Sequence, residues 1–263
     1  MSKTVLITGI AKGIGKAIAE RFLEKAYIVH GTFFSSEQNA RELQRKYGTD
    51  KLILHGPYDF RDLTQTKALI RKLASVRFDT IVPSAGMFSE NDDFNNFDLD
   101  KFNQTMHCNF YAPLMLTIGL QNNINEGGSI VVMSSNDAFP GAFASMSYSI
   151  SKTALISLMK CLAVNYGKKK VRVNAVAPGA IDTDMNTEEQ MEISPYFTPI
   201  SCVGSPADVA KAVYFLASDE ASFINGETVT IDGGYNIVSV LLKSEADPSL
   251  SKDLRAFIKS HSQ

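Results

Sequence analysis

The stretch that decides the fold of this 263-residue chain is Thr8-Gly9-Ile10-Ala11-Lys12-Gly13-Ile14-Gly15, read together with its two flanks. Before it, Val5-Leu6-Ile7 is a short apolar, β-branched run of the kind that forms a buried parallel strand. After it, residues 17–22 carry apolar side chains at helical spacing. The glycines therefore lie in a turn from a strand to a helix, where backbone N–H groups can approach a pyrophosphate. The glycine spacing, Gly-x3-Gly-x-Gly, differs from the commoner Gly-x-Gly-x-x-Gly dinucleotide turn, and turns also use glycine for structural reasons alone.

The same strand-to-helix alternation continues along the chain. The alternation predicts an α/β fold in one domain: a three-layer, doubly wound parallel sheet with right-handed crossovers. We expect strands at 4–8, 27–32, 52–55, 79–83, 129–134, 171–176 and 228–231.

A second signature is Tyr148-Ser149-Ile150-Ser151-Lys152, which follows a serine pair at Ser134 and Ser135. Residues four apart share a helix face, so Lys152 is expected beside the Tyr148 phenol. A unit charge at ~4 Å and an effective dielectric of ~20 contributes on the order of 4 kcal/mol. Lowering a tyrosine pKa by ~2 units requires roughly 2.7 kcal/mol. With Ser135 placed to polarise a carbonyl, the set predicts carbonyl–alcohol redox chemistry on a nicotinamide cofactor.

Joined to the glycine turn, this set resembles the short-chain dehydrogenase/reductase family, whereas Tyr-x-x-x-Lys alone arises readily by chance. The resemblance runs from about Lys3 to Tyr235 and is closest to the 3-oxoacyl carrier-protein reductase branch. It implies a Rossmann fold. Further matches follow in the family's order at Asp59, Ala85-Gly86, Asn109, 174–183 and 226–234.

The resemblance also implies a role for each matched residue. Tyr148 would be the general acid/base, and Lys152 would hold the nicotinamide ribose and lower the tyrosine pKa. Ser135 would orient the substrate carbonyl, and Asn109 would hold a water that links Lys152 to solvent. The implied cofactor contacts are Gly9, Lys12, Gly13, Ile14, Gly15, Ser35, Asp59 (to the adenine amino group), Phe60, Ala85, Gly86, Tyr148, Lys152, Pro178, Gly179, Ile181 and Thr183 (the last two to the carboxamide).

Three departures from the family pattern stand out. Pro83-Ser84 replaces the usual Asn-Asn, which removes both amides from the floor of the cofactor site. Cys202 stands where an arginine is frequent. The chain also continues past Gly234, with a helix start at Asp247-Pro248 and apolar residues at helical spacing behind it. We expect a domain over 1–236 with a substrate lid at about 184–206, and an extension over 237–263 that is either a surface helix or a contact with a neighbouring subunit.

The type of nicotinamide follows from charge. A free ribose 2′-hydroxyl is commonly held by an acid after the second strand, yet no Asp or Glu follows residues 27–32 before Glu37. Lys12, Ser35 and Ser36 are placed to meet a 2′-phosphate instead; the alternative for Lys12, a solvated loop charge, is less favoured. NADPH is therefore the predicted cofactor, and NAD(H) is less favoured.

Composition limits the remaining classes. A net charge of −2 predicts no nucleic-acid partner, and four scattered histidines predict no metal site. Three cysteines without a CxxC pair fit a reducing compartment, so a cytoplasmic location is expected. We expect no signal peptide and no membrane segment, because the first strand begins almost at once and no long apolar run follows.

The main hypothesis is an NADPH-dependent reductase of a small-molecule ketone, such as a 3-oxoacyl thioester or another hydrophobic ketone. Alternatives are an NAD-dependent alcohol or sugar dehydrogenase, and a catalytically silent nucleotide-binding protein. Helices around 101–120 and 148–166 are expected to form a dimer face, within a homodimer or, as is usual in the family, a homotetramer. The expected pocket is largely apolar, although these side chains would also serve as loop packing: Met87, Phe88, Phe139, Phe143, Met185, Tyr196 and Phe197.

Overall fold

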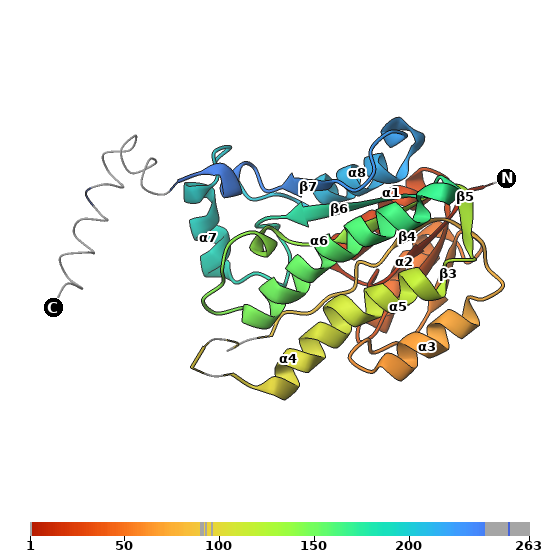
Figure 1. The fold of residues 1–263 in the computed structure, drawn as a ribbon, viewed down its shortest axis with the longest axis horizontal. Helices are drawn as coiled ribbons and strands as arrows, with labels where there is room; N and C mark the ends of the chain where they lie inside the picture. The colour runs from red at the N-terminus through yellow and green to blue at the C-terminus, as the bar shows by residue number, and fades with distance from the viewer. Residues whose placement is uncertain (1, 90–91, 93, 96, 240–251, 253–263) are drawn as a thin grey trace.

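The computed structural model describes residues 2–89, 92, 94–95, 97–239 and 252. Its sheet contains seven parallel strands in the order β3-β2-β1-β4-β5-β6-β7, which confirms the predicted doubly wound fold (Figure 1). The sequence order reverses between β1 and β4, so the carboxyl ends of these two strands border the topological switch point. The strands are β1 (Thr4–Ile7), β2 (Ile28–Thr32), β3 (Leu52–His55), β4 (Phe78–Val82), β5 (Ile124–Met133), β6 (Arg172–Pro178) and β7 (Thr228–Ile231).

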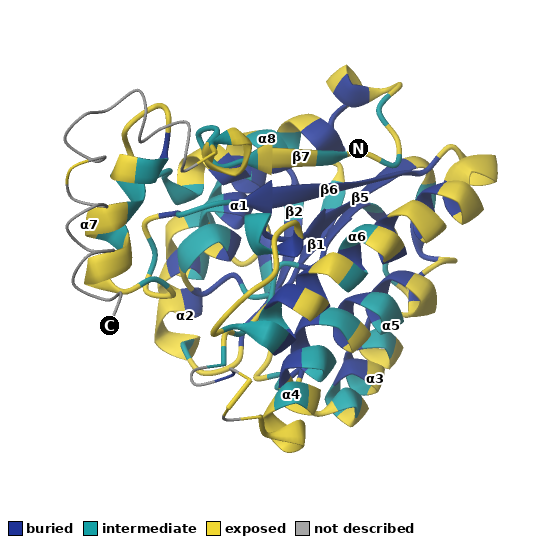
Figure 2. Cartoon of the chain, turned by 60° about the vertical axis from the view of Figure 1, so that its left-hand side comes forward, coloured by how far each residue is buried: buried dark blue, intermediate teal, exposed yellow. Residues whose placement is uncertain are grey.

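Helices cover both faces of this sheet (Figures 1 and 2). One face packs against α1 (Gly13–Glu24), α2 (Glu37–Tyr47) and α8 (Pro206–Ala217). The opposite face packs against α3 (Leu63–Lys72), α4 (Leu99–Met106), α5 (Ala112–Gly119) and α6 (Met146–Tyr166). A further helix, α7 (Glu188–Phe197), lies beyond the ends of β6 and β7.

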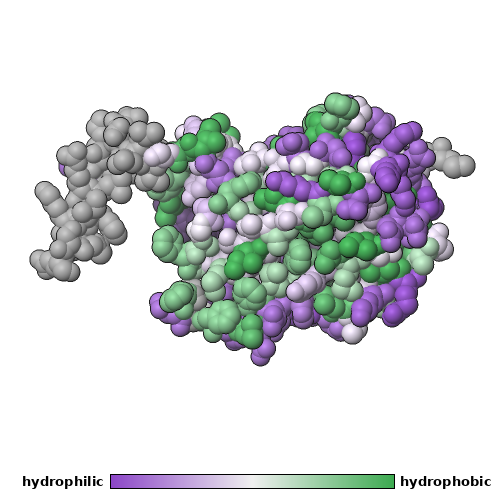
Figure 3. Space-filling view, in the orientation of Figure 1, coloured by the Kyte–Doolittle hydropathy of each residue, from purple (hydrophilic) through white to green (hydrophobic). Residues whose placement is uncertain are grey.

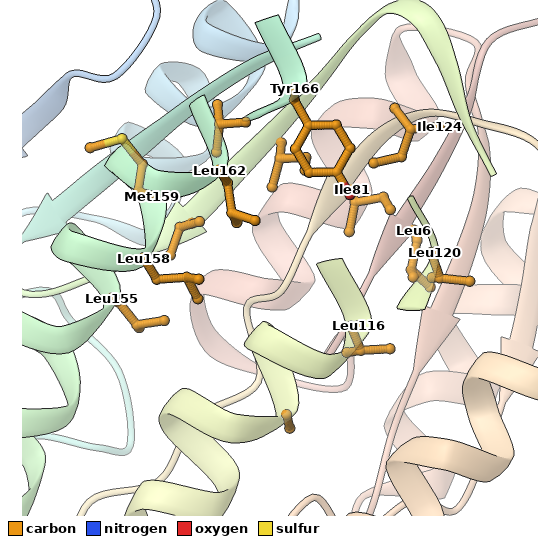
Figure 4. Close-up of a cluster of buried hydrophobic side chains, with 14 of the residues drawn as sticks. Leu6, Ile81, Leu116, Leu120, Ile124, Leu155, Leu158, Met159, Leu162 and Tyr166 are labelled. Atoms are coloured by element: carbon orange, nitrogen blue, oxygen red, sulfur yellow. The ribbon is translucent and has the colours of Figure 1, made fainter. Parts of the chain in front are cut away.

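Each face of the sheet has its own apolar cluster. On the α5 and α6 side, Leu116 and Leu155 pack toward Leu6 and Ile81 of the sheet, and all four are almost completely buried (Figure 4). Burying one such side chain contributes roughly 1.5–3 kcal/mol, so the clusters supply the main driving force for the three-layer arrangement. Figure 2 shows the strands as the buried centre of the molecule.

Strand β5 differs most from the expected boundaries. Residues 129–134 were expected, but β5 begins at Ile124 and crosses Gly127, which has φ = +76°. Its pairing with β4 shifts register between Phe78 and Thr80. The glycine pair at 127–128 is therefore a bulge inside a strand, not the break before one.

The helix expected over 101–120 contains a π-helical turn, His107–Tyr111, between α4 and α5. Its wider loop is closed by the Ala112 N–H, which donates to the His107 carbonyl five residues earlier. Such a turn rotates the residues before it relative to those after it. Asn109 lies in this turn and points into the protein, where it is fully buried.

Two expectations concern other parts of the chain. The helix expected after Asp247 lies outside the described residues. Among those that are described, no helix combines the length and apolar character needed to cross a bilayer. The same residues contain no group of three or more His, Cys, Asp or Glu side chains arranged to hold a metal ion.

Candidate active site

The glycine turn is fastened to the sheet by its own backbone. The Thr32 carbonyl at the end of β2 accepts hydrogen bonds from Gly9 N (3.1 Å) and Ile10 N (2.9 Å). On the other side, the Thr8 hydroxyl accepts a hydrogen bond from Ala85 N at 2.9 Å. The turn is thus fixed between β2 and the segment after β4, at the switch point of the sheet.

Sterics explain why glycine occupies this turn. Gly9 has φ = +76°, and a Cβ on Gly15 would lie 2.1 Å from the Gly9 carbonyl oxygen, which no side chain tolerates. Gly13 has φ = +56°, and a Cβ there would lie 3.5 Å from Thr183 Cγ2. The turn therefore presents bare backbone at the start of α1, next to Thr183, and this shape fits a pyrophosphate.

The departure at Pro83-Ser84 has a local compensation. The bond between Ala85 N and the Thr8 hydroxyl holds the segment after β4 against the turn, with no asparagine amide involved. A Cβ on Gly15 would lie 3.4 Å from Ser84 Oγ, so Ser84 packs directly against the turn. A short side chain is what this contact allows.

Lys152 lies at the centre of the second signature. It is buried, and its ammonium donates to the Met133 carbonyl at 2.9 Å. Its Nζ lies 5.3 Å from the centre of the Tyr148 ring. A Cβ on Gly86 would lie 3.6 Å from Lys152 Nζ and 3.4 Å from Asn109 Oδ1. Gly86, Asn109, Tyr148 and Lys152, predicted separately, are therefore brought together.

The structure corrects the prediction that Lys152 lowers the pKa of Tyr148. Burial raises the pKa of Tyr148 to about 12; a hydrogen bond with Ser135 lowers it, and the charge of Asp137 raises it. Burial also lowers the pKa of Lys152 to about 8, against opposing effects of Cys108 and Asp137. Desolvation dominates because Lys152 is buried and directs its ammonium to a backbone carbonyl, while Tyr148 is half-buried beside it. Tyr148 is consequently a neutral phenol at pH 7.

Ser135 is held in place by the short helical turn that follows it, Asn136–Ala138. Its hydroxyl accepts from Asp137 N at 3.2 Å, while Ser149 Oγ on α6 donates to the Asp137 carbonyl at 2.8 Å. Thr153 Oγ1, one turn further along α6, donates to the Ala138 carbonyl at 2.8 Å. The serine segment is tied to the helix that carries Tyr148, which fixes the two hydroxyl groups relative to each other.

Asn109 has its side chain engaged on both ends. Its Oδ1 accepts from Met87 N at 2.8 Å, and its Nδ2 donates to the Met87 carbonyl (2.9 Å) and to Ser151 Oγ (3.2 Å). In this structure the side chain supports the segment after β4. The water relay implied for Asn109 stays a prediction.

Near the end of β3, Asp59 is already paired. Its carboxylate receives two hydrogen bonds from Arg61 Nε (2.9 and 3.0 Å) and one from Arg61 Nη2 (2.7 Å), and these bonds lower the pKa of Asp59. The Arg61 guanidinium lies 5.5 Å from the centre of the Phe34 ring. An adenine amino group would therefore meet an Asp–Arg pair rather than a lone carboxylate, a partner that sequence reasoning missed although it stands two residues away.

The remaining predicted cofactor residues lie around the carboxyl ends of the strands. Ser35 is exposed, and Lys12 forms an exposed ion pair with Asp184 at 3.5 Å. The ring of Phe60 packs in the core, so only its backbone is left to face a nucleotide. Pro178 ends β6, Gly179 N donates to the Ile231 carbonyl, and Ile181 is buried.

A cavity of about 420 Å³ opens beside this group. Its walls come from the segment after Ser135 and from residues after β7. Asn236 Nδ2 links these two segments by donating a hydrogen bond to the Asn136 carbonyl (3.4 Å). Of the expected apolar residues, Phe143 alone is among its lining residues. The lining residues are Asn136, Asp137, Pro140, Gly141, Ala142, Phe143, Ser145, Tyr235, Asn236 and Val238.

Comparison with known proteins extends over most of the chain. A family model described as Enoyl-(Acyl carrier protein) reductase matches residues 9–236. A Pestalotiopsis microspora protein named short-chain dehydrogenase/reductase GME11373 is 34% identical, over 88% of this chain and 94% of its own. The cyclic-di-GMP-binding biofilm dispersal mediator protein of Escherichia coli is 31% identical, over 89% and 97%. A short chain dehydrogenase from Burkholderia cenocepacia, crystallised in complex with NADP, has a TM-score of 0.83 at 30% identity, over 89% and 98%.

Proposed function

Because the chain belongs to the short-chain dehydrogenase/reductase family, we propose that this oxidoreductase uses NADPH to reduce a ketone to a secondary alcohol. The observation that carries the proposal is the neutral Tyr148 phenol, tuned by Ser135 and adjoining Lys152 beside the glycine turn. A neutral phenol is the form that donates a proton to a carbonyl oxygen, so its protonation state at pH 7 suits reduction.

Each residue would have one task in this reaction. NADPH, when bound, supplies the hydride. The bare backbone around Gly9, Gly13 and Gly15 would hold the pyrophosphate, and Thr183, beside Gly13, would contact the nicotinamide end. Tyr148 would protonate the carbonyl oxygen, and Ser135 would donate a hydrogen bond to the same oxygen.

Lys152 would hold the ribose with the two donors that Met133 does not use. Asn109 fixes the Met87 backbone beside it. These two residues therefore position the cofactor and the backbone around Tyr148 and do not contact the substrate itself.

Two observations support NADPH over NADH. Residues 33–36, directly after β2, contain no acid that would hold a free 2′-hydroxyl, and Ser35 is exposed there. The similar dehydrogenase from Burkholderia cenocepacia was crystallised with NADP. In this chain Lys12 and Ser35 would meet the 2′-phosphate, Lys12 exchanging its exposed pair with Asp184 for it.

The test is NADPH oxidation, followed by absorbance, with a panel of ketones and with NADH in parallel. Tyr148→Phe should lose about 10²–10⁴-fold in kcat because the proton donor is gone, while its Kd for NADPH stays within about twofold. Tyr47→Phe, an equal change on α2, should keep full turnover. Lys12→Ala should weaken NADPH binding by about tenfold and leave NADH binding unchanged. Full activity of Tyr148→Phe, or a lower Kd for NADH than for NADPH in the unaltered protein, contradicts the proposal.

A binding role without catalysis is the second candidate, favoured by the similarity to a cyclic-di-GMP-binding protein. Calorimetric titration with cyclic di-GMP distinguishes it. Binding of that nucleotide, together with no turnover of any ketone by an NADPH-bound protein, favours this role. Competition between the two ligands would place both at the glycine turn.

Three coarser features complete the proposal. Residues 184–206, which include α7 and return to the sheet through the Ile181–Gly204 bridge, would serve as the substrate lid of a domain over 1–236. The exposed apolar side chains on α4, α5 and α6 support a homodimer or homotetramer. Three free cysteines support a reducing, cytoplasmic location.

A further inference from the structure

Asp137 links the catalytic residues to the cavity. Its backbone N–H donates to Ser135 Oγ, and its carbonyl accepts from Ser149 Oγ, the residue after Tyr148 on α6. Its side chain lines the 420 Å³ cavity. The charge of this carboxylate raises the pKa of both Tyr148 and Lys152, and the residue lies directly beside Ser135 through its backbone hydrogen bond.

The carboxylate has unused hydrogen-bonding capacity. Within the described part of the chain, no hydrogen bond or ion pair to the Asp137 carboxylate is found, unlike Asp59 with Arg61 and Asp208 with Lys211. The residue is half-buried, and burial raises the pKa of its carboxyl. A partly desolvated acceptor without a donor gains most from a donor that a ligand brings.

The rest of the cavity agrees in polarity. Asp137 is the single charged residue among the described residues that line it, and the neutral polar groups of Asn136, Ser145 and Asn236 surround it. Because no cation is among these lining residues, the negative charge of Asp137 disfavours carboxylate or phosphate groups inside the cavity. Phe143 and Tyr235 offer apolar surface for the remainder of the substrate.

We propose that Asp137 is a specificity-determining residue that binds a hydroxyl group next to the carbonyl undergoing reduction, so that the preferred substrates are hydroxyketones. This rests on the proposed reductase function and differs from the expected 3-oxoacyl thioester or other hydrophobic ketone. The hydroxyl group donates to the Asp137 carboxylate, while the carbonyl oxygen faces Ser135 and Tyr148.

Four phenyl ketones that differ at one group provide the test: α-hydroxyacetophenone, its methyl isostere propiophenone, α-aminoacetophenone and benzoylformate. A hydrogen bond to a carboxylate is expected to favour the hydroxyketone over propiophenone by roughly 10- to 100-fold in kcat/KM. In Asp137→Ala this preference should fall to within about threefold of unity; the preference is a ratio between two ketones, so the effect of the lost charge on Tyr148 cancels from it. Asp137→Asn keeps an acceptor oxygen and should retain part of the preference.

Asp219→Asn, which removes an equally charged but exposed carboxylate paired with Lys3 in the turn after α8, is the matched control and should keep the full preference. An unchanged preference in Asp137→Ala, or benzoylformate as the best substrate of the unaltered enzyme, would overturn the proposal. If α-aminoacetophenone exceeds the hydroxyketone and Asp137→Asn abolishes that, the carboxylate selects a cation and the hydroxyl assignment is wrong.

Binding of the product separates this inference from the reductase function. With NADP⁺ present, calorimetry should show 1-phenyl-1,2-ethanediol binding more tightly than 1-phenyl-1-propanol to the unaltered protein and equally to Asp137→Ala. That result without any turnover supports Asp137 and contradicts the reductase. Turnover of ketones with an unchanged product preference in Asp137→Ala supports the reductase and contradicts the role of Asp137.

Discussion

At the residue scale, the acid of the reaction is controlled by burial first and by neighbouring charge second. Tyr148 has its pKa raised to about 12 by burial, with Asp137 raising it further and Ser135 lowering it. Ketone reduction uses the protonated phenol, which is the main form of Tyr148 at every pH below about 12. Alcohol oxidation uses the phenolate, so its rate should rise about tenfold per pH unit from pH 7 until the phenol titrates.

Replacing Asp137 by Asn should move that rise to lower pH, because it removes a negative charge that disfavours the phenolate. The measurement is the pH profile of NADP⁺-dependent oxidation of 1-phenyl-1-propanol, which has no second hydroxyl for Asp137 to bind. Asp219→Asn should leave the profile in place. A profile that is unmoved, or that moves upward, in Asp137→Asn would show that its charge does not reach the phenol.

Spacing alone was enough to predict that Tyr148 and Lys152 share a helix face. It was not enough to predict the direction of the tyrosine pKa, because that depends on desolvation and on where the lysine ammonium points. The carbonyl of Met133, the group that receives it, leaves no trace in a side-chain pattern.

At the scale of elements, two adjacent strands share an unusual buried contact. His30 Nδ1 on β2 and His55 Nε2 on β3 are 3.0 Å apart, with nearly parallel rings, and both side chains are buried. Burial lowers the pKa of His30, and burial together with His30 and Lys72 lowers the pKa of His55 to about 4. The pair is neutral in the folded state near pH 7, which makes it a source of acid sensitivity.

Acidification should therefore weaken the fold between these strands. An unfolded histidine takes up its proton near pH 6.5, while folded His55 resists down to about pH 4, so unfolded chains bind more protons in this window. The resulting stability is present above pH 6.5 and is lost as the pH falls toward 4. From pH 7 to pH 5 the unfolding free energy should fall by roughly 2 kcal/mol for this one group.

Urea unfolding of single and double variants checks this. His55→Leu should cost about 1–3 kcal/mol at pH 7, because it leaves the buried His30 nitrogen unpaired. His30→Leu with His55→Leu should recover part of that loss and flatten the dependence between pH 7 and pH 5. An equally steep fall in the double variant would assign the acid sensitivity to other groups.

Periodicity predicted most elements but not their irregularities. The bulge at Gly127 and the π-helical turn around Asn109 both depend on pairing with partners distant in sequence. In each case a local pattern, a glycine pair or a continuous helical stretch, was consistent with a simpler element.

At the scale of the whole molecule, apolar side chains gather on the face formed by α4, α5 and α6 (Figure 3). Val164 on α6 is 80% exposed, and Ile150 on α6, Ile118 on α5 and Leu99 on α4 are exposed as well. A second exposed valine, Val229, lies on β7 at the edge of the sheet. An apolar helix face and a strand edge that pairs with no other strand within residues 2–239 are two separate surfaces for assembly.

The oligomer should come apart when a charge is placed at a surface that holds it together. In the proposed homotetramer, Val164→Glu and Val229→Glu should each leave dimers held by the other surface, because each buries a carboxylate in one interface; in a homodimer, only the variant at the surface in use should give monomers. Light scattering coupled to size-exclusion chromatography gives the masses. Unchanged mass in both variants, or a monomeric unaltered protein, would contradict assembly through these faces.

The fold class followed from the alternation of strands and helices, which any single substitution barely disturbs. The character of the cavity did not follow, because its walls come from segments a hundred positions apart, joined by Asn136 and Asn236. The sequence predicts a largely apolar pocket, whereas Asp137, two residues after Ser135, lines the cavity.

The two hydrogen bonds that the Thr32 carbonyl accepts from Gly9 and Ile10 limit local unfolding of the glycine turn. The turn cannot open by itself, because its amides are tied to the last residue of a central strand. It belongs to the same cooperative unfolding unit as the sheet. Because the turn is already ordered in the folded protein, it loses little further conformational entropy when a nucleotide binds. Nucleotide binding should therefore leave the local motions of the turn almost unaltered.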